Sequence, residues 1–267
     1  MKYGGNTSCV SVDCEGTLLI FDSGTGILPL GNKLMATGNR EVSIFFSHTH
    51  WDHISGFPFF KPAYSPDFNL NLYCGNLKKH GNSIFDVLSH QMENPTFPVP
   101  IDILKAKIEY HDFDAGESIE LTNQIMIETC LLNHPKGATG YRVNFEGRSV
   151  CYVTDTEHKK EGLDENILKL AKDSDLLIYD STYTEEEYPN FVGWGHSTWQ
   201  EGLRLSKEAG VKNYAIFHHD PAHDDDFMDK VDLKAKNEFV RAFVAKEGME
   251  ISFEGNNVNF GTFNNKP

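Results

Sequence analysis

The sequence predicts a single α/β domain in which β-sheets are sandwiched between helices. The first half is rich in short strand-like runs, and the second half alternates helix-like and strand-like segments. No change of composition and no internal repeat divides the 267 residues. A chain of this length can bury a sizeable core as one large domain or two small ones. We therefore expect one domain over residues 1–267.

The composition is that of an ordinary soluble globular protein, with 39% hydrophobic and 24% charged residues. No run approaches the roughly 18 apolar residues of a membrane span, so no membrane partner is expected. The first residues lack the apolar core of a signal peptide. The cysteines lack CxxC spacing and are expected to be reduced thiols of a cytoplasmic protein. They are Cys9, Cys14, Cys74, Cys130 and Cys151.

The formal net charge of −15 bears on the kind of partner. A protein whose main task is to grip long nucleic acid usually presents a basic face. Here bound metal or a few lysines would have to overcome the repulsion locally. The charge therefore favours a small substrate or a short nucleotide over a large RNA, although net charge does not describe individual patches.

The first half of the chain predicts strands joined by tight turns. We expect strands at residues 8–12 and 17–22 joined by a hairpin turn, a short helix at 28–36 and a strand at 42–46. A short helix ended by proline should follow within residues 54–60. A strand at 70–74 and a helix at 76–92 come next. The proline-rich loop at 93–100 is interpreted as a wall or lid over a pocket.

The second half alternates between strands and helices. Strands are expected at residues 106–110, 125–131, 140–145 and 149–154, and a helix at 163–171 leads to a buried strand at 176–180. A helix at 198–209 should be capped by Ser197 or Thr198. A strand at 213–217, an amphipathic helix at 229–246 and a final strand at 251–253 complete the chain.

The strand at 42–46 runs directly into a cluster of three imidazoles and a carboxylate. The cluster consists of His48, His50, Asp52 and His53. A strand that ends in this way delivers several nitrogen and oxygen ligands to one small volume. This mixture suits zinc, and also manganese or iron, better than calcium or magnesium. The alternative is a polar loop facing solvent.

Three further polar residues follow predicted strands in the same way. They are His134, Asp155 and His218. Singly, each has an ordinary explanation as a capping aspartate or a surface histidine. Because strand ends on one edge of a sheet can converge, we expect all three to meet the first cluster.

These motifs resemble the metallo-β-lactamase fold superfamily of dinuclear metallohydrolases, over nearly the whole chain. The resemblance rests on the HxHxDH pattern of residues 48–53 with the three later residues. It is greatest for the phosphodiesterase branch that includes ribonuclease Z, because Asp52 is present and Gly195-His196-Ser197-Thr198 opens a helix. The implied fold is an αββα four-layer sandwich of two mixed β-sheets flanked by helices. The chain starts almost at Gly4-Gly5-Asn6, so the family's first strand is expected to be absent or supplied otherwise.

The resemblance also implies roles for individual residues. One metal ion would be held by His48, His50 and His134, the other by Asp52, His53 and His218, with Asp155 bridging them. Zinc is the expected ion, and manganese and iron remain open. A hydroxide oriented by Asp52 would be the nucleophile, and His196 would protonate the departing alkoxide.

Three details stay open within this resemblance. His219 is the alternative to His218 as the last ligand. Glu157 could orient His196 or a ligand imidazole, or could be an exposed acid. Aromatic residues cluster around the motifs, where a few could stack on a nucleobase while most pack in the core. They are Trp51, Phe57, Phe59, Phe60, Trp194 and Trp199.

The resemblance implies a hydrolase that cleaves phosphodiester bonds, with a cyclic or short nucleotide as the favoured substrate. One alternative is the same core acting on a lactone or thioester, and another is a metal-binding sensor without turnover. A third is transfer-RNA 3′ processing, which the acidic charge and the lack of a long basic insertion disfavour. Members of the fold often pair, so a homodimer is a further open alternative.

Overall fold

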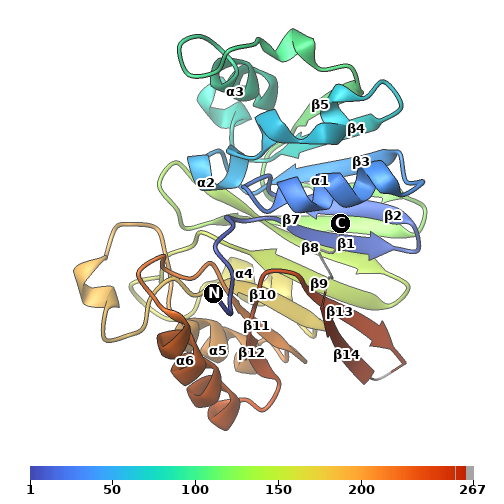
Figure 1. Cartoon of the computed structure of the whole chain (residues 1–267). Coiled ribbons are helices and arrows are strands. Elements are labelled where there is room, and N and C mark those ends of the chain that lie inside the picture. The colour runs from blue at the N-terminus through green and yellow to red at the C-terminus, as the bar shows by residue number, and fades with distance from the viewer. Residues whose placement is uncertain (256, 263–267) are drawn as a thin grey trace.

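The computed structural model, which describes residues 1–255 and 257–262, stacks two large β-sheets between two layers of helices (Figure 1). The predicted αββα sandwich of two mixed sheets is confirmed. Among the described residues, no helix combines the length and the apolar character that crossing a membrane requires.

The first sheet has five strands in sequence order. They are β1 (Val10–Cys14), β2 (Thr17–Phe21), β3 (Glu41–Phe46), β4 (Asn69–Cys74) and β5 (Lys107–Asp112). The β1–β2 hairpin is antiparallel, and β2 to β5 are parallel to one another. Their carboxyl ends therefore meet at one edge of the sheet.

The second sheet has seven strands in the order β12-β11-β10-β9-β8-β7-β6. Their bounds are β6 Ser118–Thr122, β7 Ile125–Leu132, β8 Ala138–Phe145, β9 Arg148–Val153, β10 Leu176–Asp180, β11 Tyr214–Phe217 and β12 Ala242–Val244. Strands β6 to β9 form an antiparallel meander, and β9 to β12 are parallel. A separate hairpin joins β13 (Met249–Glu254) to β14 (Asn257–Thr262).

Helices cover the outer face of each sheet. The first sheet carries α1 (Ile27–Ala36) and α3 (Ile84–Gln91), and the second carries α4 (Glu165–Ala171), α5 (Trp199–Glu208) and α6 (Asp225–Glu238). The short α2 (Trp51–Ile54) lies beside the carboxyl end of β3. Single 3-10 turns occupy Phe57–Phe59, Lys61–Tyr64, Lys78–His80, Ile101–Ile103 and Tyr188–Asn190.

The space between the sheets is filled by large aromatic side chains. Phe45 of β3 is fully buried and stacks on Tyr73, with ring centroids 4.6 Å apart. It also meets Phe21 at 5.5 Å and, across the sheet interface, Tyr141 at 5.6 Å. These contacts fix the distance between the two sheets, and so the position of every side chain that projects from their common edge.

Several predicted boundaries in the first half are wrong for local reasons. The short helix expected within 54–60 begins earlier, at Trp51, and residues 57–59 form a separate 3-10 turn with Pro58 in its first turn. The helix expected at 76–92 starts only at Ile84, because Gly81 adopts a left-handed conformation and Ser83 then caps a new start.

The second half shows similar shifts. The helix expected at 229–246 starts at Asp225 and ends at Glu238, and residues 242–244 form β12 instead. Thr198, one of the two predicted caps, accepts a bond from the backbone N–H of Glu201 at the start of α5. Strands β6, β12 and β14 were not predicted.

The proline-rich loop contributes Phe97 to the wall of a pocket, but this pocket is not the larger cleft at the candidate site described below. Phe97 packs edge-on against Phe59, with ring centroids 5.5 Å apart, and both line a small separate surface pocket.

We expect Phe45→Ala to lower the free energy of unfolding by about 3–5 kcal/mol, because it removes a buried ring from a well-packed core. Denaturant unfolding followed by circular dichroism measures this loss. Phe59→Ala is the matched control, since Phe59 is 58% exposed and its loss should cost less than about 1 kcal/mol. Equal losses in the two variants would contradict this account of the core.

Candidate metal centre

The predicted site residues all follow the carboxyl ends of strands, and these ends meet at one edge of the sandwich. Residues 48–53 follow β3, His134 follows β7, Asp155 follows β9 and His218 follows β11. Strands β7, β9 and β11 point the same way within the second sheet. The side chains therefore converge, although they are up to 170 positions apart in the chain (218 − 48).

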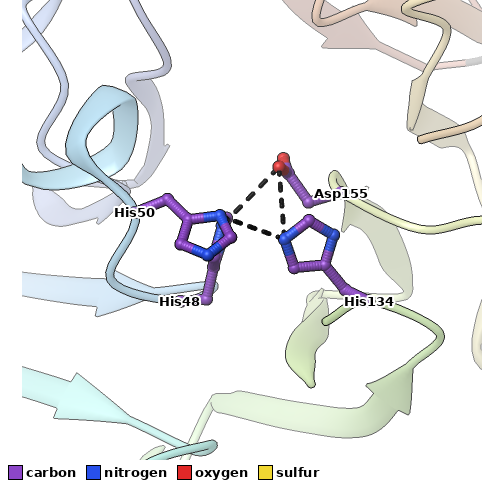
Figure 2. A group of neighbouring side chains, drawn as sticks. All are labelled: His48, His50, His134 and Asp155. Carbon is purple, nitrogen blue, oxygen red and sulfur yellow. Dashed lines mark hydrogen bonds and ion pairs between the residues drawn. The ribbon is translucent and has the colours of Figure 1, made fainter. Parts of the chain in front are cut away.

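The first group of converging side chains is shown in Figure 2 and comprises His48, His50, His134 and Asp155. One ligand atom from each lies within 4.8 Å of the others. His134 Nε2 is 3.2 Å from His50 Nδ1, and Asp155 Oδ2 is 3.6 Å from His48 Nε2. This spacing suits side chains that surround one small cation.

The second group comprises Asp52, His53, Asp155 and His218. His53 Nε2 lies 3.1 Å from Asp52 Oδ2 and 3.2 Å from Asp155 Oδ1. His218 Nε2 lies 3.2 Å from Asp52 Oδ2. Asp155 thus belongs to both groups, with one carboxylate oxygen toward each.

The structure brings His218 into this group and turns the neighbouring His219 away. The Nε2–H of His219 donates to the carbonyl oxygen of Ile216 at 3.0 Å. Burial lowers the pKa of His219 to about 4, so this ring is neutral at pH 7.

Four of the imidazoles have their Nδ1 atoms bound by the protein. His48 Nδ1 bonds Ser47 Oγ, His53 Nδ1 bonds Asp22, His134 Nδ1 bonds the carbonyl of Gly195, and His218 Nδ1 bonds Thr182 Oγ1. A histidine that donates from Nδ1 keeps the lone pair of its Nε2. In the neutral form of each ring, these bonds leave four Nε2 lone pairs directed toward the centre of the site.

Two of these Nε2 atoms, those of His48 and His53, are buried and make no hydrogen bond. An unpartnered polar atom in the interior is costly unless an ion or water satisfies it. Burial and the neighbouring imidazoles hold the pKa of His48 well below its ordinary value, which favours the neutral form that binds metals. The donor set fits divalent cations.

The carboxylates are held in their ionised forms. Burial raises the pKa of Asp155, but His218, His53 and His48 outweigh it and keep the pKa well below its usual range. Burial raises the pKa of Asp52 as well, but the imidazoles of His218 and His53 beside its carboxylate outweigh burial and lower the pKa. Ionised carboxylates and imidazole nitrogens together are the ligands that zinc, manganese and iron accept.

Asp22, at the end of β2, is a buried carboxylate that was not predicted as a site residue. It accepts bonds from the backbone N–H and the hydroxyl of Ser47, both at 2.7 Å. It also accepts from His53 Nδ1 and from the hydroxyl of Tyr152, each at 2.8 Å. The signal in the sequence was an acid directly after a buried strand, the same signal that identified Asp155.

Asp180, at the end of β10, is a second residue that was missed. Its Oδ2 lies 3.1 Å from Nδ1 of His196, and its Oδ1 accepts from the hydroxyl of Thr182 at 2.8 Å. Burial lowers the pKa of His196, but the Asp180 carboxylate outweighs it by charge and hydrogen bonding and raises the pKa to about 9. His196 is thus a protonated imidazole at pH 7.

Glu157 does not touch His196 or a candidate ligand directly. Its carboxylate accepts from the backbone N–H groups of Gly193 and Gly195, at 2.7 and 3.0 Å, and from the hydroxyl of Tyr188. The carbonyl of Gly195 in turn holds His134 Nδ1. Glu157 therefore fixes the loop that precedes His196, and through it one imidazole of the cluster.

Three site residues adopt left-handed backbone conformations. The φ angles are +61° for Asp22, +55° for Asp155 and +62° for His218. Such angles are unfavourable for side chains with a Cβ, and they occur where surrounding contacts enforce them. Each residue directly follows or closely follows a strand, so the turn of the backbone aims its side chain across the sheet edge.

A cleft of about 1090 Å³ opens at the site. Asp52, His196 and His218 are among its lining residues, and the N-terminal segment, the loop after His218 and residues 245–251 line much of the rest. Its charged lining residues include more acids than bases. The acids are Asp52, Asp220, Asp224, Asp225, Glu247 and Glu250, and the bases are Lys33 and Lys246.

Comparison with known proteins shows what this arrangement is similar to. The profile of the Beta-lactamase superfamily domain matches residues 19–219. A "Ribonuclease Z" from Myxococcus xanthus is 33% identical over 298 aligned positions, covering 94% of this chain and 91% of the relative.

Two solved structures share the fold. The metallo-beta-lactamase fold protein YhfI from Bacillus subtilis is 19% identical, with a TM-score of 0.68, and covers 97% of this chain and 96% of that one. The short form of human tRNase Z is 20% identical, with a TM-score of 0.60, and the match covers 80% of this chain and 86% of that one.

In Asp180→Asn, we expect the pKa of His196 to fall from about 9 toward its ordinary value of 6.5, since the main charge that stabilises the imidazolium is removed. Titration of the imidazole resonances of the metal-free protein by NMR measures this shift. Glu157→Gln is the control, because it leaves the Asp180 bond in place and should leave the pKa unchanged. An unaltered pKa in Asp180→Asn would refute this assignment.

Proposed function

Because this chain belongs to the beta-lactamase superfamily, in its ribonuclease Z-like branch, we propose that it is a metal-dependent hydrolase of phosphodiester bonds. One observation carries the proposal. The imidazole of His196, whose Nδ1 is held by Asp180, stands beside the two ligand groups, with Nδ1 3.8 Å from Asp155 Oδ2 and its ring stacked 5.2 Å from that of His218. An acid at this place suits a reaction whose leaving group departs as an alkoxide.

The two groups of side chains would hold two divalent ions. His48, His50 and His134 would bind one ion, Asp52, His53 and His218 the other, and Asp155 would serve both. Zinc is the first candidate, and manganese and iron suit the same donor atoms. Divalent ions bound there supply Lewis acidity, which lowers the pKa of water toward neutrality and offsets negative charge on phosphoryl oxygens.

The protein's own residues supply the remaining chemistry. Asp180 occupies Nδ1 of His196, so only Nε2 is free to hand a proton to the leaving oxygen. Asp52 is ionised and 40% exposed, so its carboxylate can accept a hydrogen bond from an attacking water and orient it. Asp180 keeps His196 protonated, and Glu157 keeps the loop that carries it in place.

The relatives favour RNA as the substrate. Curated relatives are named ribonuclease Z, and one similar structure is a tRNase Z. Their names support the RNA-processing alternative better than the cyclic or short nucleotide that the sequence favoured. We therefore propose cleavage near the 3′ end of an RNA as the first candidate activity.

A short nucleotide is the second candidate. The excess of acids along the cleft opposes a long polyanion, which favours a substrate with few phosphates. The two candidates are separated by comparing turnover of a precursor transfer-RNA transcript with that of a panel of cyclic nucleotides. A homodimer and a cytoplasmic location remain predictions.

We expect the purified protein to hold two divalent ions per chain. His218→Gln should reduce this to about one, because it removes a candidate ligand, whereas His219→Gln should keep two, since His219 points away from the cluster. Metal analysis after dialysis gives the stoichiometry. A full complement of ions in His218→Gln would overturn the ligand assignment.

We expect the protein with zinc or manganese to cleave bis-p-nitrophenyl phosphate and at least one RNA or cyclic-nucleotide substrate. His196→Ala should lower kcat on the natural phosphodiester by about 10²–10⁴-fold, because an alkoxide needs a proton to leave. The loss on bis-p-nitrophenyl phosphate should be far smaller, since p-nitrophenolate leaves without one.

The activity of the wild type should fall as pH rises through the pKa of His196, because the proton donor loses its proton there. Equal turnover of the RNA by His196→Ala and wild type would exclude the proton-donor role. Absence of any phosphodiester cleavage by the metal-loaded wild type would refute the proposed function itself.

A further inference from the structure

Trp194 is an exposed indole at the candidate site. Its side chain is 62% exposed, and it lines the same cleft as His196 and His218. Leaving so large an apolar ring in water forgoes the stabilisation that its burial would give. Exposed aromatic rings beside a cleft are typical of sites that bind flat ligands.

The backbone around Trp194 is fixed on both sides. Gly193 and Gly195 have φ angles of +91° and +86°, which a residue with a Cβ rarely adopts. Glu157 accepts a hydrogen bond from the N–H of each glycine, and Trp194 N–H donates to the carbonyl of Phe191 at 3.0 Å. A Cβ on Gly195 would lie 2.3 Å from His134 Nδ1. The indole therefore stands on a rigid turn.

Ring contacts connect this indole to the proton donor. Trp194 meets the ring of Phe191 edge-on, with centroids 5.5 Å apart. Phe191 stacks on Tyr183 at 4.3 Å, and Tyr183 meets His196 edge-on at 6.2 Å. The position of Trp194 relative to His196 is thus set by packing as well as by the backbone.

We propose that Trp194 is a stacking platform for a nucleobase of the substrate, adjacent to the phosphodiester bond that is cleaved. This inference rests on the proposed function and names a group that the substrate must carry. The acids along the cleft disfavour extra phosphates but do not oppose a neutral flat ring. Every base offers a π-face, so stacking here selects for a nucleotide without reading its sequence.

The other exposed tryptophan fits this role less well. Trp51 is 64% exposed and lies in α2 beside Asp52, but it is not among the residues that line the cleft. We therefore assign the stacking role to Trp194 alone.

The kinetic test compares two chromogenic phosphodiesters with the same leaving group. Thymidine 5′-(p-nitrophenyl phosphate) carries a base, and methyl p-nitrophenyl phosphate does not. We expect the wild type to prefer the first by about 5- to 100-fold in kcat/KM. Trp194→Ala should abolish this preference, because it should raise KM for the thymidine ester much more than KM for the methyl ester.

Two variants serve as controls for the kinetic test. Trp194→Phe keeps an aromatic ring and should retain most of the preference. Val192→Ala alters a residue of the same turn that is equally exposed, and it should leave kcat/KM unchanged for both esters. An equal loss on both esters in Trp194→Ala, or no loss on either, would overturn the inference.

A binding test decides the inference without turnover. In a Trp51→Phe background, Trp194 is the one exposed tryptophan among the three in the sequence, since Trp199 is 4% exposed. Adenosine 5′-monophosphate should quench its fluorescence saturably, and ribose 5-phosphate should not. The further change Trp194→Phe should abolish the quenching.

The two tests separate this inference from the proposed function. If the metal-loaded wild type cleaves no phosphodiester, these two esters included, the proposed function fails, and the quenching alone decides whether Trp194 binds a base. If the wild type cleaves both esters but shows no base preference that depends on Trp194, the function stands and the inference fails.

Discussion

The buried carboxylate of Asp22 is the interaction on which the rest of the site depends. It accepts four hydrogen bonds, from Ser47 twice, from His53 and from Tyr152. A buried carboxylate is tolerated only when its oxygens are fully bonded. These donors come from the end of β3, from α2 and from β9, so one side chain joins the two sheets at the edge where the site lies. Loss of Asp22 would release the imidazole of His53 and remove the hydrogen bonds that join residues 47–53 to the end of β2.

The same principle extends around the cluster. Each of four imidazoles is oriented by a bond from its Nδ1 to a group that is not a candidate ligand. The site is therefore preorganised by groups outside it, and the aromatic layer between the sheets holds those groups at the right separation. Stability of the core and geometry of the site are two aspects of one packing arrangement.

The sequence predicted the parts of the site that have a strong local or repeated signal. The four residues from His48 to His53 lie in six consecutive positions, and His134, Asp155 and His218 repeat the same placement after buried strands. Asp22 and Asp180 have that placement too, but a single acid after a strand is as often a cap. Their roles depend on partners 31 and 16 residues away in the chain, which only the fold brings together. The helical period of α6 was predicted correctly, but the predicted bounds of 229–246 were wrong, because the helix runs from Asp225 to Glu238 and residues 242–244 pair with β11. Tertiary pairing overrides local propensity there.

The left-handed turns at Asp22, Asp155 and His218 have a consequence for how such a site evolves. A non-glycine residue held in this conformation costs about 1–3 kcal/mol, so each of these positions would gain backbone stability from glycine. At Asp22 the four hydrogen bonds offset this cost, whereas the side chains of Asp155 and His218 face mainly other candidate ligands. Selection for stability alone would thus favour glycine at Asp155 and His218. A descendant freed from its chemistry should drift toward glycine at these two turns before its core changes.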